Sequence, residues 1–462
     1  MTSISGSMPC CKSELDLFYS LPTNTSITSS SYTNVGANVP LTGLEENFSI
    51  EIVGNEDYID LNDIYLKLEL RLVEVVTDTT SAITTTSEVG PINNFAHSLF
   101  RKIDLSIGKG LQKTLVEVGS SHYAYKAYLL NLLNYGDDAK ESWMQSGLFY
   151  KDHSEQFDNV GVSEYKINKL KAASNNDNVE IDLTTDIPVN PGLISRRKQF
   201  IAGSGSLKVI IPLHLDFLHS NRFLLNHMGL FFDFERNKDS FLLMGDNTKV
   251  WKVEITKPSI RVRKCSIHEK VKMAHINAML ISPAKYPLRQ NKVYVFSIND
   301  QSMEYNISST TGKIPNKIVC GLVLDSAYNG SFKQNPFNFQ DYGLTEITLI
   351  VNNEHRVIKI DSTKNDFIEG FHSINESLNL YGQMGNGIRK EEYLKGNCLF
   401  CFNLNPDKGC EEQYNTLKEG SISFKLNFKD KVTDKLKFIV LMEHDNQIKI
   451  NNKYEVNFDY NL

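Results

Sequence analysis

The sequence predicts an all-β protein of two tandem eight-stranded antiparallel jelly rolls with short helical insertions, a double jelly roll. Three observations support this fold class. Runs of alternating apolar and polar residues, typical of strands with one buried face, recur along the chain. The length of 462 residues exceeds what one core of ordinary size needs and indicates two domains. A plan of hairpin followed by helix occurs once in each half.

The first copy of this plan lies in residues 98–152. Apolar and polar residues alternate from Ile103 to Ile107, and this strand runs into a tight turn at Gly108-Lys109-Gly110, where a hairpin is expected. Further on, the apolar period becomes that of a helix lying on a sheet, at Tyr125, Tyr128, Leu129, Leu132 and Leu133. A strand, a hairpin and a helical segment are therefore predicted in sequence.

Residues 335–380 repeat the plan with different side chains. A strand from Thr345 to Val351 leads through Asn352-Asn353 into a return strand. A helix-like segment with Phe367, Phe371, Ile374 and Leu378 then follows. The repeat is one of pattern and not of residue identity.

The other strands are predicted from alternation or from short continuous apolar runs. In the first half they are 48–52, 64–72, 207–214, 230–235, 239–244 and 247–264. In the second half they are 293–298, 303–307, 318–324, 398–404, 421–428 and 436–443, with the first two expected to pair as a hairpin. Strand order does not follow from this pattern, so two β-sandwiches of another topology stay an alternative.

The chain is predicted to divide into three parts. Residues 1–40 are rich in Ser, Thr and Asn and are expected to form an N-terminal arm. Within the arm, the apolar residues Leu15, Leu17, Phe18 and Leu21 indicate docking on a neighbour. The first jelly roll is expected at 41–256 and the second at 257–462. Residues 153–207 are mostly polar, and we interpret them as a long loop that runs over the surface.

Composition restricts the classes of function. A net charge of −6 argues against a protein that wraps nucleic acid over a large surface, so nucleic-acid contact is not required. Seven cysteines, an odd number, indicate synthesis in a reducing compartment such as the cytosol. No run approaches the roughly 20 apolar residues of a membrane span, and a signal peptide is not recognisable. We therefore expect no transmembrane segment.

Three patterns resemble metal sites and are interpreted as structural. His268-Glu269 and His275 are seven residues apart and not four, so the two imidazoles would not share a helical face. Cys398 and Cys401, with Cys410 beyond them, have CxxC spacing, but in a strand the first two point to opposite faces. The third pattern is His214, Asp216 and His219, which lie among apolar residues.

Other signatures of chemistry are also weak. Gly108-Lys109-Gly110 is too short for a phosphate-binding loop, and GSGS at 203–206 does not have the spacing of a serine nucleophile elbow. Two basic clusters could contact phosphate but resemble ordinary solvated faces: Arg196-Arg197-Lys198, and Arg261, Arg263 and Lys264. The sequence therefore predicts no catalytic, cofactor-binding or metal-binding residue, no cofactor, and a protein that is not an enzyme.

Several blocks of the chain carry a family resemblance. One is the stretch 98–152, with its YAYKAYLLNLLNYG and LFYKD. The other blocks are VIIPLHLDFLHSNRFLLN, FERNKDSFLLM, KPSIRVRKCSIHEKV, AKYPLRQNKVYVFSI, GLVLDSAYNGSFKQNPFNFQDYGL and NGIRKEEYLKGNCLFCFNL. These blocks resemble proteins encoded by Maverick/Polinton elements and adintovirus-like viruses. The resemblance covers about residues 45–462, but the arm and residues 153–190 do not match.

This resemblance implies a double-jelly-roll major capsid protein of a tailless double-stranded DNA virus lineage. Such a protein forms homotrimers whose six jelly rolls make a pseudo-hexagonal tile of an icosahedral shell. The implied partners are neighbouring capsomers and a minor (penton) capsid protein. The implied location is the virion, after synthesis in the host cytoplasm.

Three alternatives stay open from the sequence. One is a minor capsid component of the same group. The second is a jelly-roll attachment or carbohydrate-binding protein, since the fold also hosts sugar sites. The third is a cupin-like enzyme, which needs His and Glu ligands on adjacent strands.

Overall fold

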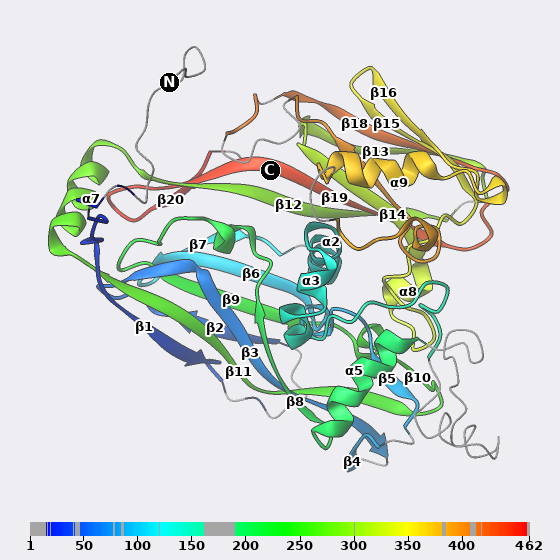
Figure 1. The fold of residues 1–462 in the computed structure, drawn as a ribbon, viewed down its shortest axis with the longest axis horizontal. Coiled ribbons are helices and arrows are strands. Elements are labelled where there is room, and N and C mark those ends of the chain that lie inside the picture. Colours follow the sequence, from blue (N-terminus) through cyan, green and yellow to red (C-terminus); the bar gives the residue numbers. More distant parts are fainter. Residues whose placement is uncertain are drawn as a thin grey trace.

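The structure is a computed structural model. It describes residues 15, 17–18, 20–39, 41, 47–76, 79–84, 87–119, 121–160, 190–299, 301–380, 385–406, 413–416 and 418–459. Two β-sandwiches lie side by side, with the N-terminal half below the C-terminal half in the view of Figure 1. Both halves are built from antiparallel sheets.

The first half consists of two facing sheets. One sheet has the order β1 (Ile27–Gly36), β11 (Val250–Ile267), β3 (Tyr58–Val76), with β8 (Ser206–Pro212) and β4 (Thr79–Ala82) both pairing with β3. The other sheet has the order β2 (Asn47–Ile52), β9 (Gly229–Arg236), β6 (Phe100–Lys109), β7 (Gln112–Glu117). A small ribbon pairs β5 (Val89–Pro91) with β10 (Leu243–Gly245).

The second half has the same plan. One sheet has the order β12 (Ala284–Ile298), β19 (Leu436–Ile450), β14 (Lys317–Leu324), β17 (Leu399–Asn403), and β20 (Val456–Phe458) also pairs with β19. The other has the order β13 (Glu304–Lys313), β18 (Glu419–Phe428), β15 (Leu344–Val351), β16 (Glu354–Lys359).

The strand order identifies the topology. If the main strands of each half are numbered from one to eight along the chain, both halves have one sheet in the order 1-8-3-6 and one in the order 2-7-4-5. Two sheets of this order are a jelly roll. The predicted double jelly roll is confirmed, and sandwiches of another topology are excluded.

Helices and short helical turns occupy the connections. In the first half they are α1 (Phe95–Ser98), α2 (Tyr123–Asn134), α3 (Asp137–Lys140), η2 (Trp143–Gly147), α5 (Pro191–Ala202), η3 (Asp216–His219) and α6 (Asp239–Leu242). The linker α7 (Glu269–Ile281) joins the halves. In the second half they are α8 (Asp325–Asn329), η4 (Ser362–Lys364), α9 (Ile368–Ser377) and η5 (Lys390–Glu392). The predicted repeat is confirmed, because α2 follows the β6–β7 hairpin and α9 follows the β15–β16 hairpin.

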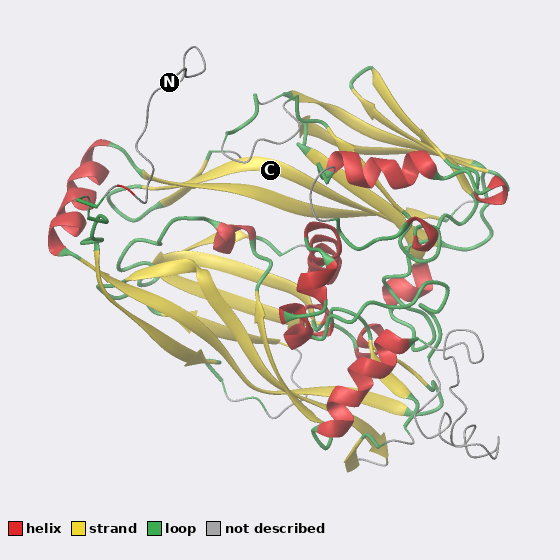
Figure 2. Ribbon diagram, in the orientation of Figure 1, coloured by secondary structure: helices red, strands yellow, loops and turns green. Residues whose placement is uncertain are grey.

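The connections distribute unevenly between the two ends of the molecule. Because paired strands are antiparallel, the connections that follow strands three, five and seven of each half lie at one end. These connections carry α5, α6, α8 and α9, whereas α7 lies at the other end (Figure 2). The N-terminal segment enters β1 at the α7 end (Figure 1).

The sequence alternation explains the strands. In β3, the apolar residues Ile64, Leu66, Leu68, Leu70 and Leu72 are buried, and the polar residues between them face outward. The β6–β7 hairpin turns at Gly110, whose φ of 61° is in the left-handed region that glycine adopts without a Cβ clash. Burial of one face per sheet thus yields a core in each half.

Several sequence predictions need correction. Residues 293–298 and 303–307 do not pair with each other, because β12 pairs with β19 and β13 with β18. Residues 239–244 are the helix α6 followed by β10 and not a single strand. The predicted surface loop at 153–207 contains the packed helix α5, while residues 161–189 lie outside the described part.

The predicted limits of the three parts stay predictions, but two elements bear on them. Strand β1 occupies residues 27–36 of the segment expected to be an arm, and it is strand one of the first jelly roll. The expected division between residues 256 and 257 lies inside β11, which pairs with β3 as far as Cys265.

We predict that Leu66→Ala lowers the free energy of unfolding by about 2–5 kcal/mol, because Leu66 is fully buried between the sheets of the first half. Urea unfolding followed by fluorescence measures this change. The matched control is Leu111→Ala in the β6–β7 turn, where the side chain is 100% exposed and a change below about 0.5 kcal/mol is expected. Equal effects of the two variants would contradict this description of the core.

Candidate functional site

The junction between the halves is built around α2. Its aromatic residues face a segment of the second half, and the rings of Tyr128 and Phe337 stack with centroids 4.0 Å apart. Tyr125 meets the same Phe337 ring edge-on at 5.5 Å. All three side chains are buried. The helix therefore lies between the two halves and gives them one continuous apolar core (Figure 1).

A buried ion pair supports the junction and corrects the prediction for the first basic cluster. Arg196 is fully buried in α5, where its Nη2 donates to Asp152 Oδ1 at 2.6 Å and its Nε donates to the carbonyl of Pro91 at 2.7 Å. The other carboxylate oxygen of Asp152 accepts from Asn335 Nδ2 of the second half at 3.1 Å. Arg197 is also buried, so this cluster is not a solvated face.

A second buried charge network crosses the junction at Asp216. Lys126 Nζ of α2 donates to Glu117 Oε1 at 2.7 Å and to Asp216 Oδ2 at 2.9 Å. Asp216 also accepts from the backbone N–H of Asn291 at 2.8 Å and from its side chain at 3.0 Å. Burial, and then the neighbouring carboxylate of Asp216, raises the pKa of Glu117 to about 7. One cation thus holds two carboxylates, and one of these carboxylates binds strand β12.

The predicted trio of His214, Asp216 and His219 is brought together, but its polar atoms are used structurally. His214 Nε2 lies 2.8 Å from Asn131 Oδ1 of α2. The His214 ring lies 4.8 Å from the ring of His97 and 5.9 Å from that of His219. Burial lowers the pKa of His97 to about 3 and that of His214 well below its ordinary value. These imidazoles are neutral packing groups.

The other residues singled out from the sequence are also structural. His268 caps α7 by accepting from the N–H of Lys270 at 3.2 Å, and His275 contacts the Tyr58 hydroxyl at 3.0 Å. Cys398 and Cys401 are buried free thiols, and burial raises the pKa of Cys401 to about 12. Cys410 lies outside the described residues.

The second basic cluster is engaged in contacts within the protein. The Arg261 guanidinium lies 4.0 Å from the centre of the Tyr32 ring, which is a cation–π contact. Arg263 pairs with Asp60 at 3.0 Å, and Lys264 donates to the carbonyl of Val53 at 3.1 Å. These side chains fasten β1 and β3 to β11. The GSGS segment at 203–206 forms the turn between α5 and β8.

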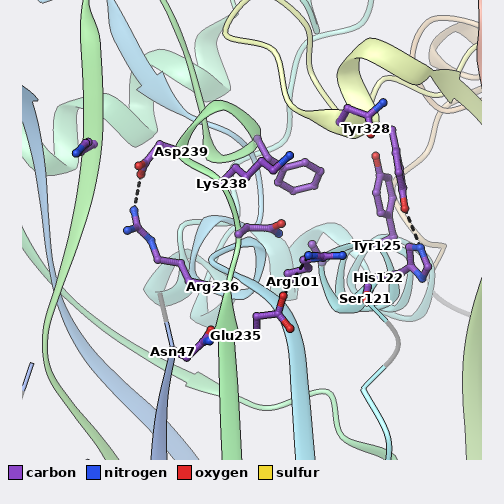
Figure 3. Close-up of a pocket in the computed structure, with 15 residues that line it drawn as sticks. Asn47, Arg101, Ser121, His122, Tyr125, Glu235, Arg236, Lys238, Asp239 and Tyr328 are labelled. Carbon is purple, nitrogen blue, oxygen red and sulfur yellow. Dashed lines mark hydrogen bonds and ion pairs between the residues drawn. The ribbon is translucent and has the colours of Figure 1, made fainter. Parts of the chain in front are cut away.

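A cavity of about 560 Å³ lies where α8 of the second half meets β6, β9 and α2 of the first (Figure 3). Its wall carries two ion pairs, Arg101 with Glu235 and Arg236 with Asp239. His122 Nε2 lies 2.8 Å from the Tyr328 hydroxyl, and this contact closes one side of the cavity. This cavity could not be predicted from the sequence, because its residues come from separate stretches of both halves and nothing in their local spacing relates them.

The described ranges contain no group of three or more His, Cys, Asp or Glu side chains placed to hold a metal ion. Within the same residues, every helix is too short or too polar to cross a bilayer.

Comparison with known proteins gives one sequence relative of moderate similarity and several structural ones. An uncharacterized protein of Caenorhabditis elegans is 26% identical over 401 residues, which cover 82% of this chain and 85% of that protein. No protein-family model matches the chain.

Solved virus structures have the same fold. A chain of the Sputnik virophage superposes with a TM-score of 0.62 at 11% identity, covering 98% of this chain and 93% of that one. The capsid model of the virus PBCV-1 gives 0.54 at 10% identity, covering 96% and 100%. The mavirus major capsid protein gives 0.51 at 9% identity, covering 100% and 97%. The chain therefore has the double-jelly-roll fold of these viral capsid structures over its whole length.

We predict that Asp152→Asn lowers the free energy of unfolding by about 3–5 kcal/mol, because it leaves the buried Arg196 guanidinium without a counter-charge. Urea unfolding measures the loss. The control is Glu155→Gln, which removes an exposed ion pair with Lys395 and is expected to cost less than about 1 kcal/mol. A loss at Asp152 no larger than at Glu155 would show that the Arg196 contact is not the support described.

We also predict that acid destabilises the protein through its buried histidines. His214 stays neutral in the fold, whereas in the unfolded chain it binds a proton near its ordinary pKa of 6.5. Its contribution to stability is therefore complete above pH 6.5 and is lost as the pH falls, by about 1.4 kcal/mol between pH 8 and 5.5. Unfolding free energies measured across this range give the slope.

The variant His214→Gln should lose about that part of the pH dependence. The matched control is His355→Gln, which makes the same substitution at an exposed histidine on β16 and removes no buried imidazole. An unaltered slope in His214→Gln would exclude His214 as a source of the acid sensitivity.

Proposed function

We propose that this chain is the major capsid protein of an icosahedral double-stranded DNA virus and acts as a structural subunit, not as an enzyme. The observation that carries the proposal is the double jelly roll itself, with one strand order repeated in both halves and the halves joined through a common core. The same fold occurs over full length in the Sputnik and mavirus structures.

The proposed assembly is a homotrimer. Three copies of a chain with two similar halves place six jelly rolls around one axis, which gives a tile with nearly hexagonal outline and true threefold symmetry. Such a tile requires that the two halves keep a fixed relative orientation, because any hinge between them would change the angles of the outline. The buried contacts of α2 and of Asp152 meet this requirement.

At a finer level, we propose that the protein belongs to the Maverick/Polinton and adintovirus-like group. The resemblance of the sequence blocks listed above supports this assignment. The protein would be made in the host cytoplasm and reside in the virion. Its partners would be neighbouring capsomers and a minor (penton) capsid protein. Contact with nucleic acid is not required, because Arg196 and Arg197 are buried.

For the domains, we propose an N-terminal arm that ends where β1 begins, with α7 as the linker between the jelly rolls. This modifies the limits at residues 40 and 256 that the sequence indicated. The pairing of β1 with β11, and of β11 with β3, supports the change.

The test is the mass of the purified protein in solution, followed by negative-stain microscopy of the same sample. We expect a species near three times the chain mass of 52.4 kDa, and hexagonal tiles or shells. A stable monomer that binds glycans on an array would refute the proposal in favour of an attachment protein. Trimers found only at the vertices of shells built by another protein would make it a minor component.

A further inference from the structure

The linker helix α7 carries an apolar stripe that nothing covers within the described residues. Not one of its 13 residues is buried. At 100° per residue, Met273, Ile276 and Leu280 lie within a narrow sector of the helix surface. All three are exposed, as is Ile281 at the end of the helix. A stripe of this kind on a helix usually faces a partner, because exposed clusters of large apolar side chains mark interaction surfaces.

The opposite side of α7 faces the protein. His275 contacts the hydroxyl of Tyr58 on β3, and Val271 and Met279 pack against the core. On the helix these three residues are centred about 130° away from the stripe. The orientation of α7 is therefore set, and the stripe points away from the body of its own chain.

A second apolar cluster lies at the same end of the molecule. In the N-terminal segment, Leu15, Leu17, Phe18 and Leu21 are between 68% and 99% exposed. The segment leads into β1 beside the start of α7, where the N–H of His268 donates to the carbonyl of Ser26 at 2.9 Å. Two uncovered apolar surfaces thus lie at the same end of the molecule, and neither covers the other.

The charges around the two surfaces are complementary. Glu14 and Asp16 alternate with the leucines of the N-terminal segment. By their helical positions, Lys270 and Lys272 lie on either side of the stripe of α7, and Glu269 lies in line with it one turn before Met273. With these charges α7 has a net charge of +1, whereas residues 12–21, which include Lys12, have a net charge of −1. The opposite net charges favour the N-terminal segment over other occupants.

We propose that the N-terminal segment of one copy binds the α7 stripe of a neighbouring copy, so that α7 is the binding site for this segment. This inference rests on the proposed shell function, in which all copies of a tile have their α7 ends on the same side. Twelve residues separate Leu15 from Ile27, and an extended chain of that length spans about 40 Å. A sheet of four strands about 4.8 Å apart is about 20 Å wide, so the segment can cross to an adjacent chain.

The test is a disulfide cross-link that can form only between chains. Both chains carry Cys10→Ser and Cys11→Ser, which removes the cysteines of the arm itself. One tagged chain also carries Leu17→Cys, and a second chain of different size carries Ile276→Cys. The two are co-expressed and oxidised, and the mixed disulfide is read on a non-reducing gel. We expect a mixed band at least tenfold stronger than in the matched control.

The control replaces Ile276→Cys with Ile368→Cys. Ile368 is an equally exposed isoleucine on a helix, but α9 lies at the opposite end of the molecule. In a second measurement, Ile276→Ser combined with Leu280→Ser should weaken the association of chains into trimers or shells by about tenfold or more, because two large apolar side chains lose their burial. Both residues are exposed in the single chain, so circular dichroism should show an unchanged fold.

The outcomes separate this inference from the proposed function. Trimers or shells that form without a mixed disulfide above the control would overturn the arm–α7 contact and leave the capsid function standing. Loss of binding to phospholipid vesicles in the serine variant, with assembly unchanged, would overturn it in favour of a lipid surface. A protein that stays monomeric would overturn both.

Discussion

The packing of α2 between the two halves is the constraint on which the rest of the structure depends. A jelly roll closes its own core and could rotate freely against a second one joined by a linker. Here the aromatic side chains of α2 enter the second half at Phe337, and the orientation of the halves is therefore fixed by close packing and not by α7. Close-packed interiors do not deform continuously, so the pair behaves as one body. The tile proposed above would require this rigidity.

The buried charges at the same junction provide directional contacts that apolar packing does not supply. Two charge networks are removed from water here: Arg196 with Asp152, and Lys126 with Glu117 and Asp216. The loss of hydration costs free energy that the attraction between the charges only partly offsets. In return, each carboxylate presents oxygens that only one arrangement of neighbours satisfies. Asp152 binds Asn335 and Asp216 binds Asn291, both from the second half. The networks therefore select one docking geometry among the many that apolar contact alone would permit.

The strands could be predicted from the sequence because their signal is local. In β3 the alternation of apolar and polar residues predicts a strand, and Gly110 predicts a tight turn. Neither prediction depends on residues that are distant in the sequence. The burial of Arg196 could not be predicted, since three charged residues in a row read as a solvated surface and the partner Asp152 is 44 residues away. Pairing between β12 and β19 was missed for the same reason, because a hairpin with the next strand is the nearest choice in sequence. The cavity beside α8 combines residues of both halves and has no local signature at all.

The placement of the helical insertions has a consequence for how such a protein can vary. The strand order sends the connections after strands three, five and seven of both halves to a single end, where α5, α6, α8 and α9 lie. A longer insertion there extends the molecule along its strands without widening it across them. Chains of different length can therefore keep one footprint and differ in height, so that the thickness of a layer built from them changes while its lattice spacing does not.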